Sequence, residues 1–511
     1  MLAPEFNQQL CRGVEERGSG GAQHPSTSAL QRSMAERSEL PHKISSPDWV
    51  KEAIFYQIFP ERFCNGDPSN DPANVQPWGT PPTPHNFMGG DLRGVIQQFD
   101  YLLDLGVNAI YLNPIFQSSS NHKYNTYDYY QIDPRFGDLA TFQELLSLAH
   151  GHGVRVILDG VFNHCGRGFF PFYDLLENGQ HSPYKDWFYV KGLPLHAYRG
   201  KVNYGVRWNV RSLPKFNVAN PATRRYLLDV ARYWIQQGAD GWRLDVPNGI
   251  ADHDFWREFR QAVKAANPQA YIVGEIWYTL DATPWLQGDQ FDGVMNYVLQ
   301  QALVNFIAKE KIKVRAFDRR IRQLLARHDR QINLAQLNLL GSHDTTRFLT
   351  ESGSETEKLK LAYLFLMTYP GAPCIYYGDE VGLTGGPDPE CRRCMPWDES
   401  QWITPLRDFV KGLIAIRKAN PALRIGSFEP VLADAARNIY AYQRQDESQT
   451  ILVVINNNPT AQRAEVPLSR GSLRGIKAFA DLLSGQEHAP VGGTLRLTVS
   501  GRAGAILAAR Y

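Results

Sequence analysis

The chain has 511 residues, with 54 basic and 52 acidic side chains and a formal net charge of +2. A chain of this length has room for two or three domains and a substantial core. The near balance of charge argues against nucleic acid or an anionic membrane as the main partner. No apolar run reaches the roughly 18 residues that a membrane-spanning helix needs.

The start of the chain shows no basic stretch followed by an apolar block, so we see no secretory signal. Six scattered cysteines favour free thiols in a reducing compartment, and we expect a cytoplasmic protein. Residues 1–46 are rich in Gly, Ser, Gln and charge without apolar periodicity, which predicts disorder. A more ordinary start begins at Met34, so we hypothesise that residues 1–33 are an extension or a misplaced start. The intact mass of the protein from its native source would test this.

Short apolar runs typical of buried parallel strands recur along the chain from residue 47 to residue 424. Their alternation with helical segments predicts a parallel sheet, and their number favours a closed (β/α)8 TIM barrel over a doubly wound sheet. The predicted strands are Ile54–Phe59, Ala109–Leu112, Val154–Leu158, Gly241–Leu244, Tyr271–Gly274, Gly293–Asn296, Gln336–Leu340 and Pro373–Tyr377.

Helix signals lie between these runs. The apolar spacing of Leu92–Leu105 predicts one helix, and Asp138 is placed to cap the next. Asn220 followed by Pro221 is a typical helix start, and a further helix is predicted from Asp254.

Two regions depart from the barrel pattern. Residues 165–217 hold twelve aromatic side chains and predict a small lid domain inserted after the third strand. From about residue 425 to residue 511 the pattern changes to short alternating strands, among them Asn438–Arg444, Thr450–Asn456 and Thr494–Val499. This pattern is typical of a separate antiparallel β-sandwich.

Four of the predicted barrel strands end on an acid: Asp159, Asp245, Glu275 and Asp344. The carboxyl ends of barrel strands meet at one face, so these acids are predicted to surround one active site. A single strand-end Asp is more often a cap or turn residue, and Arg243 with Asp245 is more often a structural ion pair. Their ordered joint occurrence favours a functional site.

The stretches that carry these acids resemble the four signature regions of the α-amylase family, glycoside hydrolase family 13. They are Asp159-Gly-Val-Phe-Asn-His164, Gly241-Trp-Arg-Leu-Asp245, Gly274-Glu-Ile-Trp277 and Ser342-His-Asp344. Asn65-Gly-Asp-Pro-Ser-Asn-Asp71, Asn121-His-Lys-Tyr124 and Trp242-Arg-Leu-Asp-Val-Pro-Asn248 resemble its neopullulanase, cyclomaltodextrinase and maltogenic amylase branch. Members of that branch usually carry an N-terminal β-domain, for which we expect no room here. The oligomeric state stays open.

Splitting a bond between sugars requires one ionised carboxylate and one carboxylic acid. We interpret Asp245 as the nucleophile, because Arg243 two residues earlier faces the same way and should lower its pKa. Glu275 lies among apolar neighbours that should raise its pKa, which suits a general acid and base. Carboxyl groups about 5–5.5 Å apart would give retention of configuration, which we expect.

The resemblance implies further roles. Asp344 is implied to bind sugar hydroxyls as the third catalytic carboxylate, and Asp159 to orient the site. His164 and His343 are implied to hydrogen-bond the same sugar. The other implied substrate-binding residues are Arg243, Tyr124 as a stacking platform or else a core aromatic, Trp277 on the leaving side, and Asn248.

Hard oxygen donors cluster near the start of the barrel, at Asn65, Asp67, Asn70, Asp71, Gly89 and Asp91. Such a set suits a structural Ca²⁺, and the resemblance implies one, while an Asx-rich turn is the alternative. Cys391 and Cys394 have the spacing of half a zinc site, but no second Cys or His pair follows, so we expect no zinc there. Arg392 and Arg393 are expected to border the cleft.

These observations predict a retaining hydrolase of α-1,4-glucosidic bonds in maltodextrins, cyclodextrins or pullulan, with some transglycosylation. Relatives usually read Val-Ala-Asn-Glu where this chain has Val246-Pro-Asn-Gly249. This change leaves open the balance between hydrolysis and transfer. The alternatives are an α-glucosyl transferase or isomerase of the same superfamily, and a non-catalytic binding subunit. We would expect a binding subunit to have lost the carboxylates that this chain keeps.

Overall fold

The computed structural model describes residues 45–468 and 473–511. The predicted disorder of residues 1–46 and the alternative start at Met34 fall almost wholly outside the described residues.

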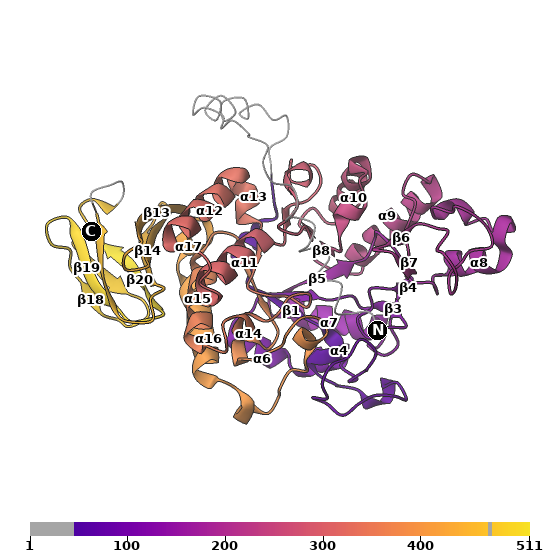
Figure 1. The fold of residues 1–511 in the computed structure, drawn as a ribbon, viewed down its shortest axis with the longest axis horizontal. Helices are drawn as coiled ribbons and strands as arrows, with labels where there is room; N and C mark the ends of the chain where they lie inside the picture. Colours follow the sequence, from indigo (N-terminus) through magenta and orange to yellow (C-terminus); the bar gives the residue numbers. More distant parts are fainter. Residues whose placement is uncertain (1–44, 469–472) are drawn as a thin grey trace. The chain divides into compact units, whose positions relative to one another are not determined.

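A closed ring of eight parallel strands forms the centre of the molecule (Figure 1). Neighbours run in the order β10-β9-β8-β5-β2-β1-β12-β11, and a parallel bridge from Met295 to Leu337 joins the two ends. The prediction of a (β/α)8 barrel is therefore confirmed. The strands are β1 (Phe55–Ile58), β2 (Ala109–Leu112), β5 (Arg155–Gly160), β8 (Gly241–Leu244), β9 (Tyr271–Gly274), β10 (Gly293–Val294), β11 (Leu337–Leu339) and β12 (Ala372–Tyr376).

Helices surround the barrel, and their starts follow the predicted caps. The side chain of Asp138 accepts a hydrogen bond from the backbone N–H of Thr141, and Asn220 caps the helix that begins at Pro221. The larger helices are α7 (Leu139–Gly151), α9 (Pro221–Gln236), α10 (His253–Ala266), α11 (Tyr297–Leu303), α12 (Val314–Arg327), α15 (Thr356–Thr368) and α16 (Thr404–Ala419). Shorter ones are α3 (Asp48–Glu52), α4 (Pro60–Phe63), α13 (Arg330–Leu334), α14 (Phe348–Glu351) and α17 (Pro421–Ile425).

One predicted helix is divided in two. The segment Leu92–Leu105 forms α5 (Leu92–Gln97) and α6 (Phe99–Leu105), which meet at Gln98. Gln98 leaves helical geometry, with φ −97° and ψ 15°. Val95 and Leu102 are both buried, so the apolar spacing continues across a break in the backbone. For this reason the apolar pattern alone could not reveal the break.

The segment after β5 folds around its own aromatic core. Phe172 packs edge-on against Phe188 at 5.0 Å, and Phe169 against Phe216 at 5.5 Å. The segment contains α8 (Phe170–Asn178) and a hairpin of β6 (Val206–Arg207) and β7 (Val210–Pro214). A second hairpin, β3 (Phe116–Ser118) and β4 (Thr126–Ile132), lies after β2.

The C-terminal residues form two antiparallel sheets. Six strands pair in the order β13-β14-β15-β20-β17-β18, and β16 pairs with β19. Buried apolar side chains from both sheets, including Leu452 and Leu495, form one cluster, so the predicted β-sandwich is confirmed. The strands are β13 (Ser427–Asp434), β14 (Ile439–Gln445), β15 (Thr450–Asn456), β16 (Gln462–Pro467), β17 (Ala478–Asp481), β18 (Glu487–His488), β19 (Thr494–Val499) and β20 (Ala503–Arg510).

Two buried arginines join the sandwich to the barrel. Arg417 of α16 donates to four backbone carbonyls, those of Met367, Tyr369, Gly371 and Leu423. Arg444 of β14 also donates to the Leu423 carbonyl, at 2.7 Å, and to those of Thr368, Gly426 and Ser427. Both guanidinium groups are therefore solvated by main-chain oxygens instead of water.

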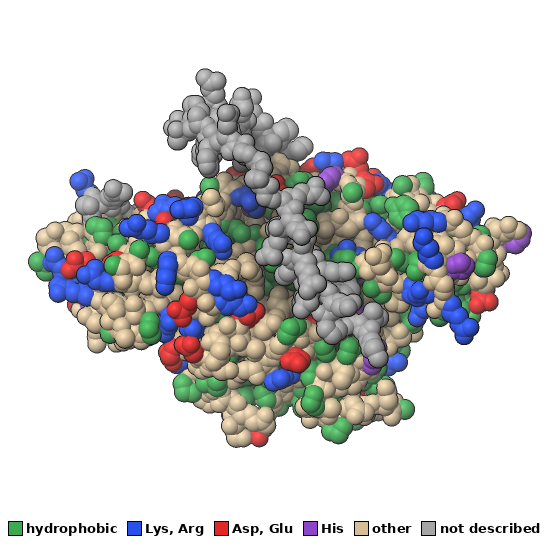
Figure 2. Space-filling model, viewed as in Figure 1, with side chains coloured by type: hydrophobic (Ala, Val, Ile, Leu, Met, Phe, Trp, Pro, Cys, Tyr) green, Lys and Arg blue, Asp and Glu red, His purple; other side chains and the backbone are tan. Residues whose placement is uncertain are grey.

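The surface carries both signs of charge. On the face in Figure 2, basic and acidic side chains are interspersed, which agrees with the small net charge. In the described part of the chain, none of the helices combines the length and apolar character that crossing a membrane would require.

Candidate active site

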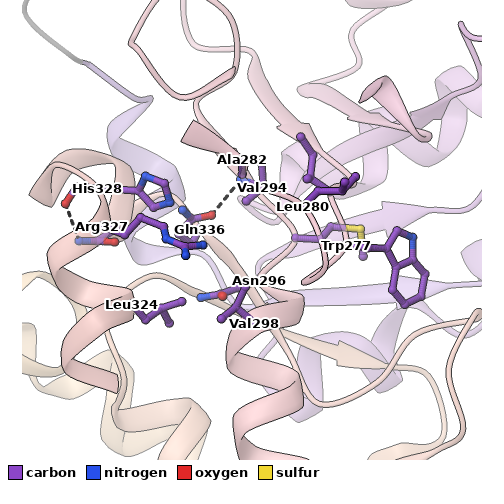
Figure 3. A pocket seen from close by; sticks show the side chains of 13 residues that line it. Trp277, Leu280, Ala282, Val294, Asn296, Val298, Leu324, Arg327, His328 and Gln336 are labelled. Atoms are coloured by element: carbon purple, nitrogen blue, oxygen red, sulfur yellow. Dashed lines mark hydrogen bonds between the residues drawn. The ribbon is translucent and has the colours of Figure 1, made fainter. Parts of the chain in front are cut away.

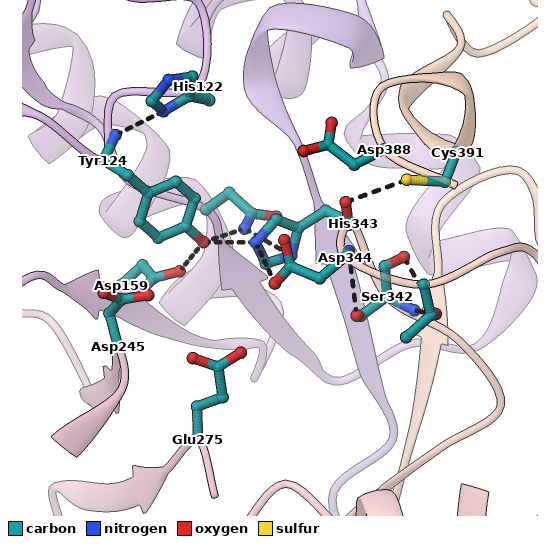
Figure 4. Close-up of polar contacts among 12 residues, drawn as sticks. His122, Tyr124, Asp159, Asp245, Glu275, Ser342, His343, Asp344, Asp388 and Cys391 are labelled. Carbon is teal, nitrogen blue, oxygen red and sulfur yellow. Dashed lines mark hydrogen bonds and ion pairs between the residues drawn. The ribbon is translucent and has the colours of Figure 1, made fainter. Parts of the chain in front are cut away.

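The carboxyl ends of four barrel strands bring the predicted acids together. Asp159 lies in β5, and Asp245 and Glu275 directly follow β8 and β9. β8 is parallel to both neighbours, with Arg243 opposite Asp159 and Leu244 opposite Gly274. Asp344 follows β11, and Figure 4 shows the carboxyl groups of Asp245, Glu275 and Asp344 directed into one space.

Arg243 is the centre of this arrangement. It is fully buried, and its Nη1 lies 2.9 Å from Oδ1 of Asp159 and 3.3 Å from Oδ1 of Asp245. Its Nη2 lies 2.9 Å from Oε1 of Glu275. One planar guanidinium thus spans three carboxyl groups, a geometry that suits Arg and that a single ammonium group cannot copy.

Burial is the main influence on the pKa values of both Asp245 and Glu275. It raises the pKa of Glu275 to about 7, and Arg243 opposes this rise. Burial, followed by the charge of Glu275, raises the pKa of Asp245 well above its usual range. The expectation for Glu275 is confirmed. Arg243 lowers the pKa of Asp245, as expected, but burial and the charge of Glu275 outweigh this effect.

Interacting carboxyls of this kind titrate as a pair. Glycoside hydrolysis needs one carboxyl protonated and the other ionised, and the pKa of Glu275 at about 7 suits the protonated partner.

Tyr124 connects two sides of the site through its hydroxyl. The hydroxyl donates to Oδ2 of Asp159 at 2.7 Å, accepts from Nδ2 of Asn113 at 2.9 Å, and lies 2.6 Å from Nε2 of His343. Its ring stacks on the His343 ring with centroids 5.4 Å apart. Hydrogen bonds to its hydroxyl and the stacked His343 ring therefore fix the tyrosine that we expected as a platform.

His343 is neutral and its tautomer is fixed. Burial, with the charges of Arg392 and Arg243, holds the pKa of His343 well below its usual range. The amide nitrogens of Gln57 and Asn113 lie 2.9 and 3.1 Å from Nδ1, so Nδ1 accepts and Nε2 carries the hydrogen. That hydrogen faces the Tyr124 hydroxyl and Oδ2 of Asp344, 3.0 Å away.

Asp344 has a cationic partner that follows the last barrel strand. Nη2 of Arg392 lies 3.0 Å from Oδ1 of Asp344, and its Nε donates to the backbone carbonyl of His343 at 2.8 Å. The Cys391 thiol donates to the same carbonyl at 3.0 Å. Arg392, expected only to border the cleft, therefore orients the third carboxylate directly.

The other predicted site residues differ in how far they are buried. His164 is buried, its Nε2 donates to the Tyr124 carbonyl at 3.0 Å, and burial lowers its pKa to about 3. Asn248 is half-buried in a short 3-10 helix (η5, Pro247–Gly249), and its Oδ1 is buried without a hydrogen-bond partner among the described residues.

Trp277 stacks on Tyr297 with ring centroids 4.2 Å apart, and it borders the pocket in Figure 3. The far side of that pocket is formed by Arg327 and His328. Trp277 follows Glu275 by two residues and borders this pocket, which suits its expected place beside a sugar.

The residue after Asp245 adopts an unusual backbone conformation. Val246 is buried and left-handed, with φ 35° and ψ 55°, which a β-branched residue rarely adopts. Its N–H donates to Oε2 of Glu275 at 3.1 Å. This hydrogen bond links the backbone directly after Asp245 to the side chain of Glu275.

The sequence reasoning missed Asn113 and Gln57. Asn113 directly follows β2. It would have been found if amide side chains at strand ends had been considered together with the acids. Gln57 is the one polar side chain in the buried strand β1. A polar residue inside a continuous apolar strand is the signal that could have identified it.

The predicted calcium residues lie in one loop. Oδ1 of Asn65 and Oδ1 of Asn70 are buried without hydrogen-bond partners among the described residues. A Cβ added to Gly89, which has φ 79°, would lie 2.0 Å from Oδ1 of Asp71, so only glycine fits here. Two orphaned amide oxygens beside a carboxylate fit a Ca²⁺ site.

All three acids of that loop accept hydrogen bonds from the protein, and Asp71 accepts from Nδ2 of Asn65 at 3.0 Å. Asp91 accepts four hydrogen bonds, from the backbone N–H groups of Gly66, Asp67 and Gly94 and from Nδ2 of Asn70. Asp67 accepts from Ser69. In this structure the carboxylates of Asp67 and Asp91 shape the loop.

Comparison with known proteins gives two family matches and many relatives. Residues 57–411 match the family model described as alpha amylase, catalytic domain, and residues 428–506 match maltogenic amylase, C-terminal domain. A cyclomaltodextrinase of Geobacillus thermopakistaniensis is 51% identical over 452 residues, which are 88% of this chain and 76% of that protein. Neopullulanase 2 of Thermoactinomyces vulgaris is 46% identical over 95% of this chain and 82% of its own.

Among solved structures, cyclic alpha-maltosyl-(1→6)-maltose hydrolase from Arthrobacter globiformis, in complex with its cyclic substrate, superimposes with a TM-score of 0.84. It is 42% identical, and the match covers 91% of this chain and all of that one. The strand-end acids, the barrel and both family matches agree, and the chain belongs to the α-amylase family.

Proposed function

We propose that the protein hydrolyses α-1,4-glucosidic bonds of maltodextrins, cyclodextrins or pullulan with retention of configuration, and transfers some glucosyl groups to sugar acceptors. The observation that carries this proposal is the pair Asp245 and Glu275, bridged by Arg243, with the pKa of Glu275 at about 7. The names of the similar proteins support the substrate class.

In the first step, ionised Asp245 attacks the anomeric carbon while Glu275 gives its proton to the leaving oxygen. A covalent glycosyl-enzyme forms and the leaving sugar departs. In the second step, Glu275 takes a proton from water or from a sugar hydroxyl, and that oxygen displaces Asp245. The pKa of Glu275 near neutrality suits both directions of proton transfer.

The surrounding residues bind the reacting sugar. Asp344, oriented by Arg392 and by Nε2 of His343, accepts hydrogen bonds from its hydroxyls. Tyr124 provides a ring held by its hydroxyl network, and His164 supports the main chain of Tyr124. Trp277 lies on the leaving side, beside the pocket of Figure 3.

The side chain of Asn248 supports transfer of a glycosyl group to an acceptor sugar as a second activity. Its buried Oδ1 has no partner among the described residues, so it can accept from a hydroxyl of a bound acceptor sugar. No carboxylate follows it, because position 249 is glycine. An added methyl at Gly249 would lie 2.4 Å from Oδ1 of Asn163, so close packing explains the glycine.

Timed product profiles on β-cyclodextrin, pullulan and soluble starch, with and without glucose as acceptor, test the proposal. We expect ring opening to maltose, panose from pullulan, and longer products when acceptor is present. Asp245→Asn should be inactive. Starch cleavage with cyclodextrin untouched would contradict the substrate class, and full activity of Asp245→Asn would overturn the nucleophile.

We further propose a structural Ca²⁺ held by the amide oxygens of Asn65 and Asn70, the carboxylate of Asp71 and the carbonyl of Gly89, with Asp67 and Asp91 shaping the loop. Such an ion would neutralise the carboxylate and fix the loop after α4. A cytoplasmic location is also proposed. The free, buried state of the cysteines Cys64, Cys165, Cys374, Cys391 and Cys394 supports a reducing compartment.

A further inference from the structure

The loop of residues 121–124, between β3 and β4, alternates between buried and half-buried side chains. Asn121 and Lys123 are buried, whereas His122 and Tyr124 are half-buried. The N–H of Tyr124 donates to Nδ1 of His122 at 3.1 Å, and Figure 4 shows the Tyr124 hydroxyl directed at Asp159. Alternate residues of this loop therefore face the protein interior and the active site.

Lys123 has a backbone conformation that is rare for its residue type. Its φ is 63°, in the left-handed region that glycine adopts most readily. Its N–H donates to the Ser120 hydroxyl at 3.0 Å. A lysine in this conformation costs free energy that a glycine would not, and such strain persists only where the surrounding contacts hold it.

The contacts that hold Lys123 are buried. Its side chain is inaccessible to solvent, and its Nζ lies 2.9 Å from Oδ2 of Asp133, which is also buried. The ammonium faces the rings of Phe136 and Phe87, whose centroids lie 4.7 and 5.7 Å away. Asp133 is the only acid paired with Lys123 among the described residues. The ammonium could therefore leave Asp133 only by becoming an unpaired buried charge, which is strongly unfavourable.

Asp133 is itself fixed by the strands on both sides of the loop. It directly follows β4, and its Oδ2 accepts from the N–H of Ser118 in β3 at 2.9 Å. Its Oδ1 accepts from the N–H of Arg135 at 3.0 Å. The guanidinium of Arg135 lies farther away, 3.8 Å from Oδ1, on a side chain that is 36% exposed. Lys123 is thus anchored to a carboxylate that the β3–β4 hairpin holds in place.

The hydroxyl contacts of Tyr124 fix only the far end of its side chain. They reach Asp159, Asn113 and His343, which come from three different barrel strands or the residues after them. The near end of the side chain is placed by the backbone of the loop. Because Lys123 directly precedes Tyr124 and is both left-handed and anchored, it sets the direction in which the chain reaches Tyr124.

We propose that Lys123 is a positioning residue, whose buried ion pair with Asp133 holds the left-handed backbone that places the Tyr124 ring against the reacting sugar. This rests on the proposed function, in which Tyr124 contacts that sugar. Lys123 acts only through Tyr124, since its own side chain is buried and cannot reach a substrate.

The test compares wild type, Lys123→Met, Tyr124→Ala and the double variant, with kcat and KM measured on β-cyclodextrin. Methionine keeps an unbranched side chain and removes the ammonium. Lys123→Met should lower kcat/KM by at least about tenfold when Tyr124 is present, and by less than about twofold in the Tyr124→Ala background, because the two residues act as one unit. Equal losses in both backgrounds, or no loss in Lys123→Met, would overturn the proposal.

The separate kinetic constants distinguish positioning from a loss of folded enzyme. A ring that stacks on the sugar contacts it before the bond breaks, so the loss in Lys123→Met should appear mainly as a higher KM. Partial unfolding would instead remove active enzyme and lower kcat at an unchanged KM. A loss confined to kcat would therefore overturn the proposal.

Lys264→Met is the matched control. Nζ of Lys264 lies 2.9 Å from Oδ2 of the buried Asp292, which directly precedes β10 at the opposite end of the barrel strands from the active site. Its kcat/KM should stay within about threefold of wild type, by the same factor with and without Tyr124, as distant sites act independently. A rise in KM equal to that of Lys123→Met would overturn the proposal.

Lys123→Met combined with Asp133→Asn covers the case in which Lys123→Met does not fold, because it removes both buried charges together. It should still lower kcat/KM by at least about tenfold, and wild-type activity in this protein would overturn the proposal. A wild type that cleaves starch but not β-cyclodextrin would contradict the proposed substrate class alone. The same comparison on starch would then test Lys123.

Discussion

Replacing Arg243 by lysine preserves the positive charge but removes the forked guanidinium that contacts all three carboxyl groups. In the structure, Nη1 contacts Asp159 and Asp245 while Nη2 contacts Glu275, and all three contacts are buried. A lysine ammonium is a single point and can satisfy only one side. Arg243→Lys therefore leaves at least one carboxyl without its cation.

The expected magnitude follows from the hydrogen bonds that this substitution removes. A hydrogen bond to a charged group contributes about 1.5–3 kcal/mol, and one or two of these disappear. After partial recovery by the ammonium, we expect a net loss of about 2–4 kcal/mol in transition-state stabilisation. At about 1.4 kcal/mol per tenfold, this is a roughly 30- to 700-fold lower kcat/KM.

The assay is initial-rate hydrolysis of β-cyclodextrin, with circular dichroism to verify the fold. Arg257→Lys is the control, because Arg257 on α10 is 44% exposed and pairs with Asp254 and Asp289 at the surface. It should stay within about twofold of wild type, as exposed pairs contribute little. A folded Arg243→Lys enzyme within about threefold of wild type would refute the bridging role.

Two further predictions concern the acid and the metal loop. Because the pKa of Glu275 is raised from 4.5 to about 7, its ionisation destabilises the native state, and stability falls as pH rises between these values. At pH 8, Glu275→Gln should therefore unfold at a higher temperature than wild type, with a free energy of unfolding greater by at most about 3 kcal/mol. At pH 4 the two proteins should unfold at the same temperature. A lower unfolding temperature of the variant at pH 8 would contradict this. Removal of Ca²⁺ by a chelator should lower the unfolding temperature, by an amount equivalent to about 2.7 kcal/mol if the free ion had been at about 100 times its Kd. Asn70→Ala should abolish this difference while Asn74→Ala keeps it, and an unaltered chelator effect in Asn70→Ala would exclude the proposed site.

The barrel and sandwich were predictable because their strands are continuous or alternating apolar runs. The predicted Thr450–Asn456 and Thr494–Val499 match β15 and β19 at both ends. The break at Gln98 was not predictable, because two short helices that share one buried face keep the spacing of one long helix. Periodicity reports which side chains are buried and not whether the backbone is continuous.

The acids of the site were predictable because strand ends converge in any parallel barrel. The raised pKa of Asp245 was not, because it depends on burial and on the charge of Glu275 from the neighbouring strand, which together outweigh Arg243.

The buried arginines between barrel and sandwich also serve as helix caps. The carbonyls of Met367, Thr368 and Tyr369 lie at the C-terminal end of α15, where no intrahelical donors remain. Arg444, which belongs to the sandwich, thus completes a helix of the barrel. The C-terminal sheet is consequently not an exchangeable module, and a barrel cut before β13 would expose unpaired carbonyls at its last helices. Calorimetry of the whole chain should show one transition for both domains, and two separable transitions would contradict this coupling.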